Sequence, residues 1–501
     1  MLLPIEQTLT ALSEAIQTLK NSDTSTAVAS AEQSVGLALG LLIAREQRGP
    51  QAVLAQFHSL EKALDSIADE LAQLGGRDGS LDALRARLAA SSRLTDLHAL
   101  ETAWRSCLQE LEALVAVGIR DQRLNAAQHE RLSRILVQWE SADLQSQMSG
   151  ASADADDANS QVIDGPRLEI YLRDRFKEPD LRVTSFRPLP GGFGKQTYLF
   201  AVQGRDLSGD FVLRRDPIRS FIDNDCHLVS VEFQVIRAVH ALGFPAPEAV
   251  WCDTEHALLP GGDFMVMRRA PGSAAGSVFS AQSAVPADLS KTLAQILARL
   301  HALPPVKELA SLKGSINSNL SQLTIAECTR QYLEEWLTLY RATPHLPSAA
   351  VLSIFGWLLE HIPQSSGHPS LLHGDIGFHN FLFHGEEGSD KRELSVVLDW
   401  EFAHVGDPAE DLAYVRNTLG TALDWPTFLA DYRAAGGTEV SDERIRFFEV
   451  WGHLRNAAAA NLATAQLVDG ATRELKMVLL PHLYIPMFLR AAQAAIDRPL
   501  V

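Results

Sequence analysis

The chain has 501 residues and a formal net charge of -18 at pH 7. This length accommodates two or three domains with sizeable cores, and a composition that is 46% hydrophobic and 21% charged indicates a globular protein rather than a disordered one. The acidic balance argues against general binding of nucleic acid or of an anionic membrane, because both partners need a basic face.

Cysteine usage and the first residues indicate a cytoplasmic protein. The four cysteines, Cys107, Cys226, Cys252 and Cys328, lie far apart and form no CxxC pair. This spacing fits reduced thiols and argues against structural zinc. The N-terminus lacks the basic region of a signal peptide, and the longest clean apolar run, residues 35–44, is too short to span a bilayer.

Apolar residues at helical spacing dominate the N-terminal part of the chain. They recur over residues 5–19, 57–71, 97–111 and 132–139. Pro50 marks a helix start, Asp96 a helix cap and Gly118 a break. We therefore expect an all-α helical bundle over residues 1–145, which is a candidate for homodimerisation, followed by a flexible acidic linker over residues 146–164.

From residue 165 to 270 the pattern changes to short extended segments with a short helix near residues 168–176 and another near residues 227–242. Gly192 and Gly194 lie between two strand-like runs, where glycines let backbone N–H groups approach phosphates. This signal is weak alone, because glycine-rich turns are common. Arg214 lies on a later strand, on the face opposite Leu213, and Glu232 lies on the helix.

Arg214 and Glu232 are open to two interpretations. A basic side chain on a strand and an acid on the following helix would form an ion pair that positions phosphates. The spacing alone favours the other interpretation, in which both are surface charges. Beyond residue 271 helical patterns dominate again, and they are interrupted by residues 371–411.

Residues 371–411 carry polar side chains at the ends of short strands. One apolar run ends in Asp375, Asn380 follows five residues later, and a second apolar run ends in Asp399. Each residue alone is common in turns. Together they supply hard oxygen ligands for Mg2+ and a carboxylate for an attacking hydroxyl, which is what phosphoryl transfer needs.

The motifs LLHGDIGFHNFLF and VVLDWEFAHVGDPAEDLAYV resemble the aminoglycoside phosphotransferase family of kinase-fold small-molecule kinases. They are most similar to the branch that includes the kinase domain fused to some acyl-CoA dehydrogenases. The resemblance covers the chain from about residue 164 onward. It implies an α+β, bilobal protein-kinase-like fold, with a small β-rich N-lobe over residues 165–270 and a large helical C-lobe over residues 271–501, and it implies ATP and Mg2+ as cofactors.

The resemblance also implies a role for each site residue. Asp375 would be the catalytic base, and Asn380 and Asp399 would bind Mg2+. The nucleotide contacts would be Gly192, Gly194, Lys195, Arg214, Glu232, Met267 and Arg269, the last two in a hinge whose backbone meets adenine. Asp407 and Asp411 match the GDP…DLA pattern and are expected to cap the following helix and brace the loop.

Two departures from the family pattern concern the nucleotide site. Phe193, Gly194 and Lys195 stand where relatives in this branch often have Ser-Asn after the paired glycines. Arg214 stands where many kinases have Lys, and Arg brings a planar fork in place of a compact charge. His379 and Glu401 lie close to the chemistry and are expected to support it rather than to perform it.

The sequence thus predicts an ATP- and Mg-dependent phosphotransferase acting on a hydroxyl group of a small molecule. The branch resemblance favours a hydroxyacyl or related metabolite as acceptor. Alternatives are an aminoglycoside or choline-like amino-alcohol kinase and a nucleotide-binding pseudokinase scaffold. A protein kinase is disfavoured, because the short distance from Asp399 to the next helix leaves little room for a peptide-binding activation loop.

Overall fold

The structure is a computed structural model, which describes residues 8, 9, 12, 25–75, 80–121, 123–146, 163–189, 195–217, 227–256, 259, 262–274, 284–365, 367–385, 393–468, 477, 478 and 480–499. The chain forms two compact units from interleaved segments. Unit 1 contains Met1–Asn159, Trp336–Ile362 and Val450–Val501, and unit 2 contains Ser160–Glu335 and Pro363–Glu449. The sequence pattern does not foresee this grouping, and the domain borders given above stay a prediction.

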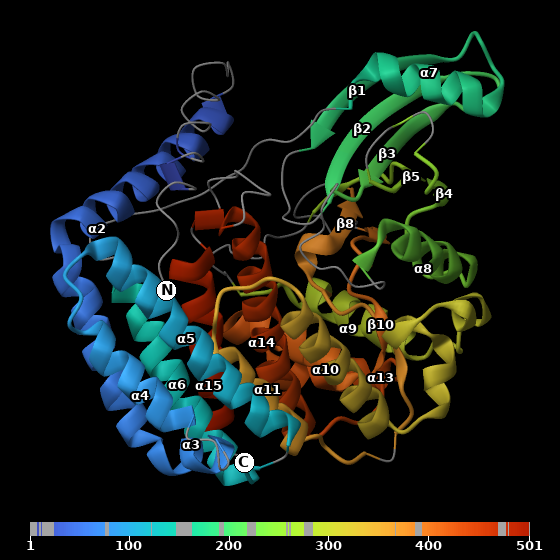
Figure 1. The fold of residues 1–501 in the computed structure, drawn as a ribbon. Helices are drawn as coiled ribbons and strands as arrows, with labels where there is room; N and C mark the ends of the chain where they lie inside the picture. Colours follow the sequence, from blue (N-terminus) through green and yellow to red (C-terminus); the bar gives the residue numbers. More distant parts are fainter. Residues whose placement is uncertain are drawn as a thin grey trace. The chain divides into compact units, whose positions relative to one another are not determined.

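Unit 1 is helical in its described part. Its N-terminal helices are α2 (Ser25–Ser66), α3 (Ala68–Gly75), α4 (Ser80–Ser91), α5 (Leu97–Arg120) and α6 (Ala126–Ser146), and it also holds α11 (Ala349–Glu360) and α15 (Ile485–Asp497) (Figure 1). Helices α10 (Ile325–Ala342) and α14 (Asp442–Val468) have residues in both units. The helical stretch expected over residues 5–19 falls mostly outside the described residues, as does the linker.

The sequence predicts a helix start at Pro50, a cap at Asp96 and a break at Gly118, and the structure confirms the first two. The helix start expected at Pro50 is a kink within α2, where Gly49 has a φ of 53°. Asp96 caps α5, because its Oδ1 accepts a hydrogen bond from Ala99 N at 2.8 Å. The break expected at Gly118 is wrong, since α5 continues to Arg120. A Cβ at residue 118 would lie 1.9 Å from Leu74 Cδ2, so this glycine permits close packing of α5 on α3.

Two acidic side chains of the N-terminal helices bind the start of α11 within unit 1. Glu140 of α6 accepts hydrogen bonds from Ser348 Oγ and from Ala350 N. Glu112 of α5 accepts hydrogen bonds from Ser348 N at 3.0 Å and contacts His345 Nε2 at 3.1 Å. Negative charge at a helix N-terminus is favourable, so these contacts tie α11 to α5 and α6. Helices α11 and α15 both pack against α6.

Unit 2 contains a five-stranded antiparallel sheet with the order β1-β2-β3-β5-β4. Its strands are β1 (Arg182–Leu189), β2 (Gln196–Gln203), β3 (Gly209–Arg215), β4 (Ala249–Asp253) and β5 (Phe264–Arg268) (Figure 1). Strand β4 is not predicted from the sequence. Arg214 pairs in register with Thr197 of β2 and Met265 of β5, which places it within the sheet.

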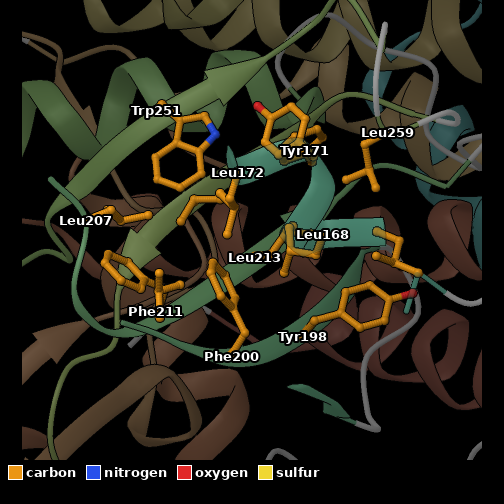
Figure 2. Packing of buried hydrophobic residues seen from close by; sticks show 14 of the residues in the cluster. Leu168, Tyr171, Leu172, Tyr198, Phe200, Leu207, Phe211, Leu213, Trp251 and Leu259 are labelled. Carbon is orange, nitrogen blue, oxygen red and sulfur yellow. The ribbon is translucent and has the colours of Figure 1, made fainter. Parts of the chain in front are cut away.

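Helix α7 (Gly165–Phe176) packs on one face of this sheet. Figure 2 shows the buried side chains of the helix beside those of the strands: Leu168, Tyr171, Leu172, Phe200, Phe211, Leu213 and Trp251. The hydroxyl of Tyr171 donates a hydrogen bond to Asp253 Oδ2 at 2.8 Å, which fastens α7 to β4. Because Leu213 belongs to this core, the side chain of Arg214 faces the other side of the sheet, as predicted.

The rest of unit 2 is helical with short strands. It contains α8 (Val229–Ala241), α9 (Ala287–His301), α12 (Ala409–Leu419), α13 (Trp425–Ala434), β6 (Ser273–Ala274), β7 (Ser370–Leu372), β8 (Phe381–His384), β9 (Glu393–Val397) and β10 (His404–Gly406). Strands β8 and β9 pair as a hairpin, which β6 extends to three strands. Strand β7 pairs with β10. Among the described helices of the chain, none has the length and apolar character needed to cross a membrane.

Candidate active site

The turn that carries Asp375 follows β7 and depends on a glycine. Gly374 has a φ of 77°, and a Cβ at this position would lie 2.4 Å from the carbonyl oxygen of Phe402. A residue with a side chain would therefore be strained here and would also clash with the chain after Asp399. The glycine lets the turn lie against that segment and sets Asp375, which is half-buried, at its tip.

Asp411 of α12 holds the same turn from beneath. Its carboxylate accepts hydrogen bonds from His373 N at 3.0 Å and Gly374 N at 2.8 Å, and it contacts His301 Nε2 at 3.2 Å. Burial would raise the pKa of Asp411, but the hydrogen bond and charge of His301 hold that pKa below its usual value. The bracing role predicted for Asp411 is therefore confirmed by its contacts.

Asp407 takes the capping role predicted for the GDP motif. Its Oδ1 accepts a hydrogen bond from Ala409 N at 2.9 Å, in the first turn of α12. Its other oxygen accepts a hydrogen bond from Arg444 Nε at 2.9 Å. The carboxylate is buried, so the guanidinium of Arg444 supplies the charge partner that burial requires.

Asn380 returns beneath Asp375, as its five-residue spacing predicts. Its Nδ2 donates to the backbone oxygen of Asp375 at 2.9 Å and to Asp375 Oδ2 at 3.2 Å. The backbone oxygen of Asn380 accepts a hydrogen bond from Leu398 N at 2.8 Å. Leu398 directly precedes Asp399, so these three hydrogen bonds connect Asp375 and Asn380 to the segment that carries Asp399.

Arg214 joins the sheet to Asp399. Its Nη2 donates to Asp399 Oδ1 at 2.7 Å, and its Nη1 lies 3.6 Å from Glu232 Oε1 on α8. The side chain of Glu232 is 0% exposed, so the interpretation of Arg214 and Glu232 as surface charges is wrong. Burial would lower the pKa of Arg214, but Asp399, Glu232 and Glu401 raise it above its usual value and keep the side chain charged.

Lys195 is buried among acidic partners. Its Nζ donates to Asp216 Oδ1 at 2.6 Å and to the backbone oxygen of His227, and it lies 3.8 Å from Glu401 Oε2. Asp216 Oδ2 also accepts a hydrogen bond from Val229 N, at the start of α8. Sequence reasoning does not identify Asp216, because its partner Lys195 is 21 residues away and joins it only in the folded sheet.

Glu401 lies between the two cations. Its Oε2 is 3.7 Å from Arg214 Nη2 and 3.8 Å from Lys195 Nζ. Burial, reinforced by the charge of Asp399, raises the pKa of Glu401 to about 8. Four carboxylates, those of Asp216, Glu232, Asp399 and Glu401, thus surround two cationic side chains. This excess of acidic groups is a setting that a divalent cation would stabilise.

The oxygen donors of the motif fit Mg2+. Asn380 directs its Nδ2 toward Asp375, so its Oδ1 lies on the opposite side of the amide. Asp399 has a φ of 66°, uncommon for a residue with a side chain, and its carboxylate is 30% exposed. Carboxylate and amide oxygens are the hard ligands that Mg2+ prefers. Within the described residues no cluster of three His, Cys, Asp or Glu has a metal-binding arrangement.

The predicted hinge is only partly available for nucleotide contacts. Met267 lies within β5, between Val212 of β3 and Ala249 of β4. The backbone N–H of Arg269 donates to Asp210 O at 3.0 Å. A backbone contact from Arg269 to adenine would therefore use its carbonyl oxygen. Gly192 and Gly194 lie outside the described residues.

Comparison with known proteins identifies the family to which these motifs belong. A sequence model described as "Phosphotransferase enzyme family" (APH) matches residues 185–448, just over half of the chain. The chain is 27% identical over 280 residues to acyl-CoA dehydrogenase family member 11 of Homo sapiens, which covers 53% of this chain and 33% of that protein. It is 31% identical over 124 residues to viomycin phosphotransferase of Streptomyces vinaceus, which covers 24% of this chain and 35% of that protein.

The chain thus matches about a third of the length of these curated relatives. Among solved structures, macrolide 2'-phosphotransferase type I is similar with a TM-score of 0.41 at 19% identity, covering 68% of this chain and 100% of that one. The predicted fold class is confirmed as a kinase-like phosphotransferase fold, with an antiparallel sheet followed by helices. The chain belongs to the phosphotransferase enzyme family, the APH family of small-molecule kinases.

Proposed function

We propose that the protein transfers the γ-phosphoryl group of ATP to a hydroxyl group of a small molecule in an Mg-dependent reaction. The observation that carries this proposal is the linkage of Asp375, Asn380 and Asp399 by hydrogen bonds at adjoining strand ends. Phosphoryl transfer needs positioning and charge stabilisation more than covalent chemistry. An orienting carboxylate beside two oxygen ligands supplies both.

Each residue then has a role. Asp375 orients the acceptor hydroxyl and accepts its proton, while Asn380 and Asp399 hold Mg2+, which neutralises charge on the phosphates when bound. Arg214 contacts the phosphates, and Glu232 keeps its guanidinium in place. Lys195 approaches the phosphates from the start of β2, and Met267 and Arg269 border the adenine. Gly192 and Gly194 lie outside the described residues and stay predicted phosphate contacts. Two N–H groups of the Lys195 ammonium are bound to Asp216 and to the backbone oxygen of His227, which leaves the third for a phosphate.

The acceptor that we favour is a hydroxyacyl compound or a related metabolite. The match to acyl-CoA dehydrogenase family member 11 supports this class, although it covers only 33% of that protein. The match to viomycin phosphotransferase, over a shorter segment, supports an antibiotic such as viomycin as a second candidate. The described cysteines Cys107, Cys252 and Cys328 are free thiols, which supports a reducing, cytoplasmic setting. Homodimerisation through the N-terminal helices stays a prediction.

A metabolite screen tests the proposed function. The purified full chain is incubated with Mg-ATP and a panel of hydroxyacyl thioesters, amino alcohols, sugars and aminoglycosides, with ADP release and phosphorylated product as readouts. We expect product with at least one acceptor, and we expect Asp375→Asn to lower its rate by about 100-fold or more, because general-base assistance is lost.

Nucleotide binding provides the control for this screen. Asp375→Asn should bind Mg-ADP as tightly as the wild type in calorimetry, because Asp375 acts on the acceptor. A protein that binds Mg-ATP but phosphorylates nothing on the panel, with or without Asp375, would support the pseudokinase scaffold. A protein that binds no nucleotide would contradict the assignment of the site.

A further inference from the structure

The ring of His379 lies beside the carboxylate of Asp375. His379 Nε2 is 3.7 Å from Asp375 Oδ2, the same oxygen that accepts the hydrogen bond from Asn380 Nδ2 at 3.2 Å. The two side chains therefore face one oxygen of Asp375, and each of them is delivered by the short turn that follows it in the chain. Contacts on one oxygen restrict rotation of the carboxylate as a whole.

The nitrogen of His379 that faces Asp375 lacks a hydrogen-bond partner. Within the described residues, His379 Nε2 is fully covered and makes no hydrogen bond, while the side chain as a whole is 14% exposed. Covered polar atoms without partners are rare, and each calls for an explanation. A distance of 3.7 Å is too long for a hydrogen bond, but catalytic hydrogen bonds are often long before substrates bind and shorten in the loaded enzyme.

Gly377 leaves the space that the ring of His379 occupies. A Cβ at residue 377 would lie 2.7 Å from His379 Cε1 and 2.8 Å from His379 Nδ1. The φ of Gly377 is -176°, an extended conformation that any residue adopts. The backbone conformation therefore does not require glycine at residue 377. Glycine is required there because a Cβ would collide with the ring of His379. Two residues of the turn together place Nε2 beside Asp375.

We propose that His379 is a positioning residue for Asp375. In the loaded enzyme its Nε2 moves to hydrogen-bond distance of Oδ2, and with Asn380 it fixes the plane of the carboxylate toward the acceptor hydroxyl. This inference rests on the proposed function, because it assigns Asp375 as the group that orients the acceptor. A misplacement of a catalytic group by about 1 Å costs on the order of 100-fold in rate, so the effect falls on kcat.

ADP release from Mg-ATP with water as acceptor tests the proposal, since water offers no further group that His379 could recognise. We expect His379→Ala to lower kcat by about 10-fold to 100-fold and to leave the KM for ATP unchanged. His379→Gln should restore most of kcat, because the Gln amide reaches the position of Nε2. Gly377→Ala should lower kcat as well, and adding it to His379→Ala should cause no further loss, since both act through the same ring.

A crystal structure of Gly377→Ala supplies a readout that does not depend on activity, and we expect the His379 ring to be displaced from Asp375. His384→Ala is the matched control, because the ring of His384 lies on β8 and contacts Ser395 Oγ at 2.8 Å; its kcat should equal that of the wild type. The inference is overturned if His379→Ala keeps the wild-type kcat, if His379→Gln fails to restore it, or if the two losses add.

Failure of the proposed function gives a different result. If ADP release is absent, or is the same in the wild type and Asp375→Asn, the assignment of Asp375 is wrong and the inference falls with it. If ADP release depends on Asp375 but not on His379, the proposed function stands and only the positioning role is lost. A Gly377→Ala structure with an unmoved ring would also refute the steric coupling between the two residues.

Discussion

Arg214 contacts three acidic side chains, more than the other cationic residue of the site, Lys195. Its guanidinium binds Asp399, which follows β9, and lies near Glu232 and Glu401. Burial raises the pKa of Glu232, and the charge of Arg214 is the largest influence that opposes this rise, ahead of Lys195 and the backbone N–H of Trp400. Removing the cation would leave a covered carboxylate with an uncompensated charge.

We therefore expect Arg214→Ala to reduce the free energy of unfolding by roughly 3–5 kcal/mol, as when a buried ion pair loses one partner. Arg214→Lys should be intermediate, because an ammonium cannot reach two carboxylates as a planar fork does. Arg268→Ala is the matched control on the same sheet: Arg268 and its partner Glu248 are 46% and 52% exposed, so the change should be within about 1 kcal/mol. Urea unfolding measures all three, and equal losses for Arg214→Ala and Arg268→Ala would contradict the argument.

A second residue-scale prediction concerns Asp411 and pH. Its pKa is held below the usual value of 3.8, in the main by His301. A group with a depressed folded pKa contributes stability above its unfolded pKa and loses that contribution as the pH falls through the folded pKa. Asp411→Asn should thus be less stable than the wild type at pH 7 by about 1–3 kcal/mol, because one amide of the turn loses its acceptor.

The same linkage predicts that this difference narrows as the pH falls below about 4, where the Asp411 carboxyl of the unfolded chain takes up its proton while the folded carboxylate stays ionised. Urea unfolding of both proteins between pH 3 and pH 7 measures the difference. A difference in the free energy of unfolding that stays constant over that range would show that the negative charge of Asp411 does not contribute to stability.

Among the elements, the start of α11 is bound by Glu140, whose contribution to stability changes with pH in the opposite direction to that of Asp411. Burial raises the pKa of Glu140 to about 7 from its usual value of 4.5, despite its hydrogen bonds from Ser348 and Ala350. The folded state then keeps a proton that the unfolded state releases. Stability contributed by this group is complete below pH 4.5, falls as the pH rises to about 7 and is constant above it.

We expect Glu140→Gln to lack this decrease, because its side chain does not ionise. The stability of the wild type relative to Glu140→Gln should fall by at most roughly 3 kcal/mol between pH 4.5 and pH 7.5. Hydrogen exchange of the α11 amides under native conditions, corrected for intrinsic rates, measures the change where it occurs. Parallel pH profiles for the two proteins would exclude a titrating Glu140.

Elements were predictable to the extent that their signals are local. The cap at Asp96, the kink before Pro50, the hairpin of β8 and β9 and the five-residue return to Asn380 all follow from neighbouring residues. Gly118 shows the limit. A glycine in a helix indicates a break when only the sequence is read, but here a side chain 44 positions earlier, Leu74, occupies the space beside it. Contacts over such distances leave no local pattern.

The same limit applies to the whole molecule. Helical periodicity shows that α11 and α15 bury one face, but it does not name the partner of that face, and both helices pack on α6 in unit 1. Within the site, Asp375, Asn380 and Asp399 were predictable because they lie in one motif. The ion pairs of Lys195 with Asp216 and of Arg214 with Glu232 needed the folded sheet, because their partners lie on separate elements.

A fragment containing residues 160–501 tests the interleaved architecture. It lacks Met1–Asn159, and therefore lacks the helices that α11 and α15 contact within unit 1. We expect low soluble yield and rapid hydrogen exchange in α11 and α15, because their apolar faces and the backbone N–H groups bound by Glu112 and Glu140 lose their partners. A soluble fragment with full-length exchange protection in these helices would show that the N-terminal helices are dispensable for them.

The interleaving of unit 1 also sets an order of events during synthesis on the ribosome. Helix α6 carries Arg134, which pairs with Asp497 of α15 only after 363 further positions have been made. At a synthesis rate of about 5–20 residues per second, α6 waits roughly 20–70 s for this partner. During that time the part of α6 that packs against α15 is open to other chains, whereas the five strands of the sheet in unit 2 emerge close together. Nascent chains stalled before α15 should thus be the ones that chaperones hold longest.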